Sequence, residues 1–146
     1  MALSAHDPQD RVDQLLALTE SLTGRLAAEA AAFEARRPLT DTFALEETAR
    51  LANLYRHECA RVRMDPSLIA GSSLPSRQKL AQATQAFEQM LERHARGLQA
   101  AKTVTEGLVR TIAGEVAAGR APGAGYGASG HAAAGDARAV TLNRRA

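Results

Sequence analysis

The sequence predicts an all-α fold: an antiparallel three-helix bundle with a long, coiled-coil-like third helix and a disordered C-terminal tail. Apolar residues recur every three or four positions through three long stretches, which is the spacing of one helix face. Valine and isoleucine are few and never alternate with polar residues over a strand length, so no sheet is expected. All five prolines fall where the periodicity stops, as expected of a residue that helices tolerate only in the first turn or beyond the end: Pro8, Pro38, Pro66, Pro75 and Pro122.

Composition favours one thin helical domain. The chain has 146 residues, of which 45% are hydrophobic, but only 3% are aromatic and much of the hydrophobic share is alanine. Alanine favours helix and buries little area, so a slender bundle is expected in place of a thick core. We place the bundle at residues 7–118 and the tail at 119–146.

The first helix is predicted at about 8–37. Asp7 is a suitable N-cap and Pro8 a suitable first helical residue, while Pro38 forbids continuation. Its apolar stripe advances in steps of three and four residues: Val12, Leu15, Thr19, Leu22, Leu26, Ala30 and Phe33.

The second helix is predicted at about 41–64. Thr40, Asp41 and Thr42 can cap its start, and Asp65-Pro66 ends it. Its stripe is Leu45, Thr48, Leu51, Tyr55, Cys59 and Val62. The following stretch, DPSLIAGSSLPS, is predicted to be a loop because of its turn residues.

The third helix is predicted at about 74–118 and carries a heptad seam, which is typical of coiled-coil packing. The seam is imperfect because it includes two threonines, a histidine and an alanine: Leu80, Thr84, Phe87, Leu91, His94, Leu98, Ala101, Thr105, Leu108 and Ile112. The tail that follows is rich in glycine and alanine. It has too few large apolar side chains to offset the entropy of ordering, so it is predicted to be disordered.

Helix lengths decide where a partner would bind. At 1.5 Å per residue the three helices are roughly 40, 35 and 65 Å long, so the first two cannot cover the third. Isolated helices of the remaining length are marginal in water, so the end beyond Gln99 is predicted to dock another polypeptide. The predicted client-binding residues are Leu98, Ala101, Val104, Thr105, Leu108, Val109, Ile112 and Val116. Alternatively, the helix bends at Gly97, Gly107 or Gly114 and folds back onto the bundle.

A second candidate for partner binding is the C-terminus, AVTLNRRA. Val140 and Leu142 alternate with polar residues ahead of Arg144 and Arg145, which is the composition of a short linear motif. The alternative is an ordinary charged terminus.

No catalytic, metal or cofactor site is expected. His57, Glu58 and Cys59 are adjacent in sequence, but neighbouring helical residues point about 100° apart and cannot converge on one ion. His94 on the seam is either pH-sensitive or, as is more common, turned to the edge of a thin bundle. No spacing pairs a nucleophile with a base, so we expect no enzyme.

Charge and composition also limit the partners and the compartment. The net charge is +2 and both signs are interspersed, so neither nucleic-acid binding nor stable membrane insertion is expected. The N-terminus lacks a secretory signal pattern, and the single cysteine suits a reducing compartment, so the sequence predicts a cytoplasmic protein.

Three segments resemble the flagellar export chaperones of the FlgN family: DRVDQLLALTESLTGRLAAEAAAFEARR, LANLYRHECARVR and AKTVTEGLVRTIAGEVA. The resemblance covers Asp7 to about Ala118. It implies a chaperone that keeps flagellar hook-associated proteins, or another helical client, unassembled and delivers them to the export machinery. It also implies client binding by the C-terminal helical region. The competing prediction is a self-associating coiled-coil scaffold in which the same segment forms a homodimer.

Overall fold

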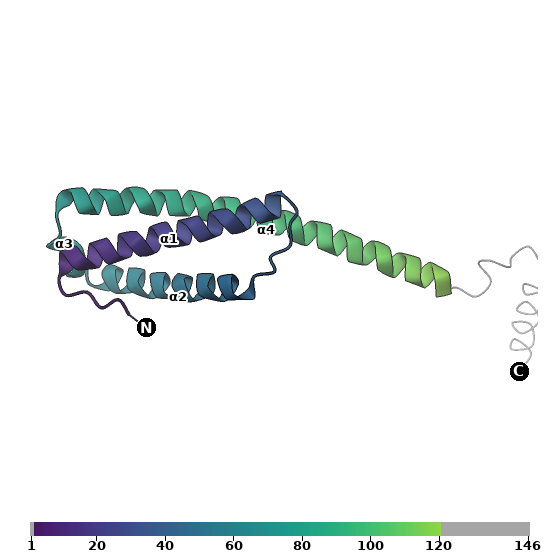
Figure 1. The fold of residues 1–146 in the computed structure, drawn as a ribbon, viewed down its shortest axis with the longest axis horizontal. Coiled ribbons are helices and arrows are strands. Elements are labelled where there is room, and N and C mark those ends of the chain that lie inside the picture. The colour runs from purple at the N-terminus through teal and green to yellow at the C-terminus, as the bar shows by residue number, and fades with distance from the viewer. Residues whose placement is uncertain (1, 121–146) are drawn as a thin grey trace, which may run out of the picture. The chain divides into compact units, whose positions relative to one another are not determined.

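The computed structural model describes residues 2–120, and these residues form an all-α fold, which confirms the predicted class. The helices are α1 (Pro8–Glu34), α2 (Thr42–Met64), the single turn α3 (Ser67–Ala70) and the long α4 (Leu74–Arg120) (Figure 1). The chain divides into two compact units, Met1–Lys102 and Thr103–Ala146. The predicted disordered tail lies outside the described residues, apart from residues 119 and 120, which belong to α4.

Helix α1 begins as the sequence predicts and ends earlier. The Asp7 carboxylate accepts a hydrogen bond from the Asp10 N–H at 2.8 Å, and Pro8 occupies the first turn. The helix stops at Glu34 instead of residue 37 because Arg36 adopts a left-handed conformation with φ of 53°. The Arg37 N–H then bonds back to the Ala32 carbonyl at 2.8 Å, which closes the helix end.

The connection between α2 and α4 was predicted to be a loop, but it contains the helical turn α3. Helix α2 is capped at its start by Asp41, which accepts a bond from the Ala44 N–H at 2.9 Å, and it ends before Asp65. Asp65 then accepts a bond from the Ser67 N–H at 3.1 Å, and Pro66 supplies a backbone angle suited to a first turn. The same Asp-Pro pair that ends α2 therefore starts the turn of α3.

The first unit is an up-down-up bundle. Arg11 near the start of α1 meets Glu58 near the end of α2, so these helices are antiparallel. Gln9 bonds Ser76 at one end of the bundle and Glu34 bonds Arg93 at the other, so α1 and α4 are parallel. Figure 1 shows the three helices side by side, with α3 at the end where α2 passes to α4.

The core of the first unit is a single apolar layer built mainly from α1. Leu22 is 1% exposed, and the Tyr55 and Phe87 rings meet edge to face at 4.9 Å between α2 and α4. The cluster contains Leu18, Leu22, Leu26 and Phe87, with Leu51, Leu54, Tyr55 and Met90 packed against it.

Within residues 2–120, no helix combines the length and the apolar character that crossing a bilayer requires.

Candidate docking surface

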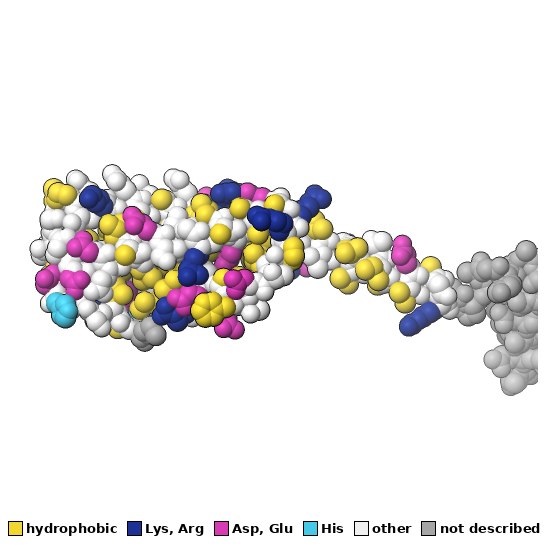
Figure 2. Space-filling view, in the orientation of Figure 1, with side chains coloured by type: hydrophobic (Ala, Val, Ile, Leu, Met, Phe, Trp, Pro, Cys, Tyr) yellow, Lys and Arg dark blue, Asp and Glu magenta, His cyan; other side chains and the backbone are white. Residues whose placement is uncertain are grey.

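The described part of the second unit, residues 103–120, is one helical segment whose residues are all exposed. Five large aliphatic side chains on it are between 47% and 60% exposed. We call these five residues the exposed apolar face: Val104, Leu108, Val109, Ile112 and Val116. Figure 2 shows hydrophobic side chains gathered along the visible side of this segment, with few charges among them. An aliphatic cluster of this kind on a helix is typical of a protein-binding surface.

The exposed apolar face covers a broad arc of the helix. At roughly 100° per residue, its two edges, Val104 and Val109, lie about 140° apart. Thr105 falls inside this arc, and Glu115 falls inside it near the C-terminal end of the helix. Arg110 and Ala117 lie on the opposite side. The segment is therefore amphipathic, with an apolar arc wider than a strict coiled-coil seam.

Of the other predicted client-binding residues, Thr105 lies in the second unit, and Leu98 and Ala101 lie in the first. Leu98 is 49% exposed and Ala101 is half-buried, and both precede residue 103. Just before them, Gly97 lies against Phe33: a Cβ at position 97 would be 3.1 Å from the Phe33 Cβ. Val140 and Leu142 lie outside the described residues.

Helix α4 runs without a break through Gly97, Gly107 and Gly114. On the segment that follows residue 102, Leu108 is 58% and Ile112 is 50% exposed. A Cβ at Gly107 or Gly114 would have no atom within 4 Å, so neither glycine is needed for a close approach.

Two carboxylate contacts join α1 to α4 at the far end of the bundle. His94 Nε2 lies 2.8 Å from Glu29 Oε2, and its ring meets Phe33 edge to face at 5.4 Å. Arg93 donates to both oxygens of Glu34, which lowers the pKa of that carboxyl. His94 therefore lies in a mostly buried contact between α1 and α4. The sequence pattern instead favoured a His94 turned to the edge of the bundle.

A buried ion pair at the other end of the bundle was not predicted from the sequence. Glu58 is fully buried and accepts bonds from Arg11 at 2.9 Å, Arg61 at 3.1 Å and the Leu3 N–H at 3.0 Å. Burial alone would raise the pKa of Glu58, but the bonds from Leu3 and Arg61 and the nearby arginine charges lower it overall. The position of Glu58 in the sequence could have indicated its burial. It follows Tyr55 by three residues and precedes Val62 by four, so it lies on the same face of α2 as the apolar stripe.

The neighbourhood of Glu58 shows no catalytic arrangement. Burial raises the pKa of the Cys59 thiol, so the reactive thiolate is disfavoured. Burial and the bond with Cys59 also raise the pKa of Tyr55 to about 12. Among residues 2–120, no group of three or more histidine, cysteine, aspartate or glutamate side chains is placed to hold a metal ion.

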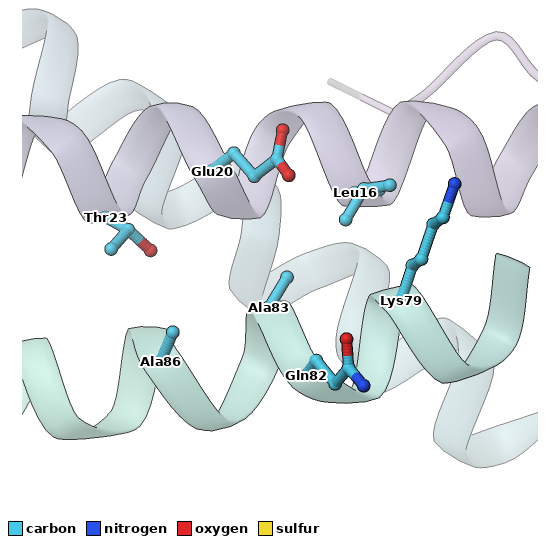
Figure 3. A pocket seen from close by; sticks show the side chains of 7 residues that line it. All are labelled: Leu16, Glu20, Thr23, Lys79, Gln82, Ala83 and Ala86. Carbon is cyan, nitrogen blue, oxygen red and sulfur yellow. The ribbon is translucent and has the colours of Figure 1, made fainter.

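A shallow groove of about 390 Å³ runs between α1 and α4 in the first unit. Figure 3 shows Lys79 reaching from α4 toward α1, while Ala83 and Ala86 are too short to fill the space. The lining residues are Leu16, Glu20, Thr23, Lys79, Gln82, Ala83 and Ala86. Glu20 is the one carboxylate in this lining, so the groove offers no pair of acids for acid–base catalysis.

The described residues thus form a small helical bundle and a helical segment with an aliphatic face left in solvent. Comparison with known proteins gives a closer relationship: the chain is 50% identical to the flagellar basal-body protein FlbY of Caulobacter vibrioides, over an alignment of 154 positions that covers the whole of both chains. The chain belongs to this family of flagellar proteins. No protein-family model matches the chain, and no solved structure matches it.

Proposed function

We propose that the protein is a cytoplasmic, non-enzymatic chaperone of flagellar assembly that binds apolar helices of flagellar client proteins. Hook-associated proteins are the proposed clients, and delivery to the export machinery is the proposed outcome. The exposed apolar face is the observation that carries the proposal, because five aliphatic residues remain about half exposed on one helical segment.

The family relationship supports the flagellar part of this proposal. The relative is named a flagellar protein and matches the chain along its full length. The chaperone activity and the hook-associated clients come from the resemblance of three chain segments to the FlgN family. In that resemblance the client-binding region corresponds to the segment that carries the exposed apolar face.

The mechanism needs only burial of apolar surface. Fully burying one valine, leucine or isoleucine side chain contributes roughly 1.5–3 kcal/mol, so a helix packed on five half-exposed side chains gains enough to offset part of the cost of association. Binding also buries the apolar face of the client helix. If that face stayed exposed, it would drive premature assembly of the client. A contact limited to one helical segment also allows release.

The proposal is tested by titrating the purified full-length protein with a purified hook-associated protein from the same bacterium, using isothermal titration calorimetry. We expect saturable binding that falls about 100-fold or more in the Leu108→Ser/Ile112→Ser double variant. The matched control, Arg110→Ser/Ala117→Ser on the opposite side of the helix, should bind within about twofold of the unchanged protein. Absence of binding to every hook-associated protein would show the proposal to be wrong.

A second candidate is a structural subunit of the basal body that self-associates through the same face. The name of the relative, a basal-body protein, favours it. Light scattering at micromolar concentration separates the two functions. A chaperone is expected to be a monomer at all concentrations and absent from isolated basal bodies, whereas a structural subunit is expected to form a tight dimer or higher oligomer and to copurify with them.

A further inference from the structure

We infer that the exposed apolar face binds two helices of the client at once, as a helical pair, and not a single helix. This inference rests on the proposed function and adds the form of the partner. The partner it describes is a protein segment with two amphipathic helices that lie together along residues 104–116.

The apolar arc is too wide for one helix to cover. A strict coiled-coil seam uses only the a and d positions, which in residues 104–116 are Thr105, Leu108, Ile112 and Glu115. Val104 and Val109 fall outside that seam, on opposite edges about 140° apart. A single helix packed over the centre of the arc would leave at least one edge valine in solvent, while two helices side by side would cover both.

In the first unit, the same helix is covered by two others. One side of α4 is held there by α1, since Arg93 bonds Glu34. The other side is held by α2, since the Tyr55 side chain interacts with Thr84. Arg93 and Thr84 lie about 180° apart around the helix, so an arc of that width requires two helices.

The heptad spacing is also continuous in the sequence. The alternating steps of four and three that place Phe87 against α1 and α2 continue through Thr105, Leu108 and Ile112. In the first unit, this heptad pattern of α4 packs against the helical hairpin of residues 8–64. The same pattern is repeated in residues 104–116, where the side chains are exposed.

Glu115 adds a chemical requirement for the partner. It lies inside the arc between Val104 and Leu108 in angle, so a helix covering that edge must pass beside its carboxylate. A buried carboxylate needs a charged or hydrogen-bonding partner. We therefore expect the client to place an arginine or lysine next to Glu115, at the end of its apolar helical pair.

The test measures both edges of the arc separately in the full-length protein, with a purified hook-associated protein as the probe. Val104→Ser and Val109→Ser remove one edge each, Leu108→Ser removes the centre, and Ala117→Ser is the control on the opposite side. Far-UV circular dichroism checks that each variant keeps its helix content. We expect each edge variant to weaken binding about tenfold, Leu108→Ser to weaken it further, and the control to bind within about twofold.

Hydrogen exchange on the complex supplies the second measurement. We expect two separate client segments to gain protection when the complex forms. If only one segment is protected and only one edge variant loses affinity, a single helix binds, and the two-helix inference is wrong while the proposed function stands. If the unchanged protein binds no hook-associated protein, or pairs only with itself, both the proposed function and this inference fail.

Discussion

Leu22 in the first unit and Leu108 in the second are both leucines on helical apolar stripes, yet they differ completely in burial. Leu22 is 1% exposed, whereas Leu108 is 58% exposed. The periodicity of the sequence is equally regular around both. The difference shows that a helical stripe marks a face able to pack, while the presence of a neighbouring helix decides whether that face is core or binding surface.

The largest expected effect comes from the buried ion pair of the first unit. Arg11→Met leaves the fully buried Glu58 carboxylate without its closest arginine, at 2.9 Å in the unchanged protein. Breaking such a pair from one side costs about 3–5 kcal/mol. Chemical denaturation should show this loss of unfolding free energy.

The matched control for that variant is an exposed pair of the same type. Arg50 pairs with Glu47, and both side chains reach solvent. Arg50→Met should therefore change the free energy of unfolding by less than about 1 kcal/mol. Equal losses in the two variants would contradict the distinction between the buried and the exposed ion pair.

The second prediction compares the two leucines directly. Leu22→Ala should cost about 2–5 kcal/mol of unfolding free energy, because it opens a cavity in the core. Leu108→Ala should change it by less than about 0.5 kcal/mol, because its side chain is already largely in solvent. Thermal or denaturant unfolding of the monomer measures both, and a large loss for Leu108→Ala would mean that its side chain is covered in solution.

The helices were predictable because their signals are local. Asp7-Pro8 and Asp41 fix the helix starts through capping, and the four-three spacing fixes the stripes. The end of α1 was not predictable from these signals, since it depends on Arg36 taking a left-handed conformation that is uncommon for arginine. The turn of α3 was missed because Asp65-Pro66 was interpreted only as the end of α2.

The candidate surface was predictable in part for a different reason. The lengths of three helices follow from residue counts, so the exposed apolar side chains in residues 104–116 could be expected from the sequence alone. The Arg11–Glu58 pair could not, because it joins residues 47 positions apart and depends on the register of α1 against α2. Charged residues on an apolar stripe reveal their partner only when that register is known.

The third prediction concerns pH. The pKa of Glu58 lies below its ordinary value of 4.5 in the folded protein, so the folded state favours the ionised form. The resulting stability is fully present above the unfolded pKa and is lost as pH falls through the lower folded pKa. Between the folded and unfolded pKa values, unfolding takes up at most one proton at Glu58. Glu58 therefore contributes at most about 1.4 kcal/mol per pH unit to the slope of the unfolding free energy against pH.

Glu58→Gln removes that ionisation and keeps the side-chain shape. Denaturation midpoints measured from about pH 6 to about pH 3 should therefore fall less steeply in this variant than in the unchanged protein. Parallel curves would show that Glu58 has the same pKa in both states and that the ion pair does not contribute to acid sensitivity.

The smallest expected effect compares two glycines of α4. A Cβ at Gly107 would have nothing within 4 Å, so Gly107→Ala should strengthen the helix by about 1 kcal/mol, seen as slower hydrogen exchange in residues 103–120. Gly97→Ala should not give this gain, because its Cβ would lie 3.1 Å from the Phe33 Cβ, and Phe33 would have to shift by a few tenths of an ångström to make room. Slower exchange in Gly107→Ala with lower stability in Gly97→Ala would show that one glycine is kept for packing and the other is not. Stabilisation by both substitutions would instead mean that α4 does not press against Phe33 in solution.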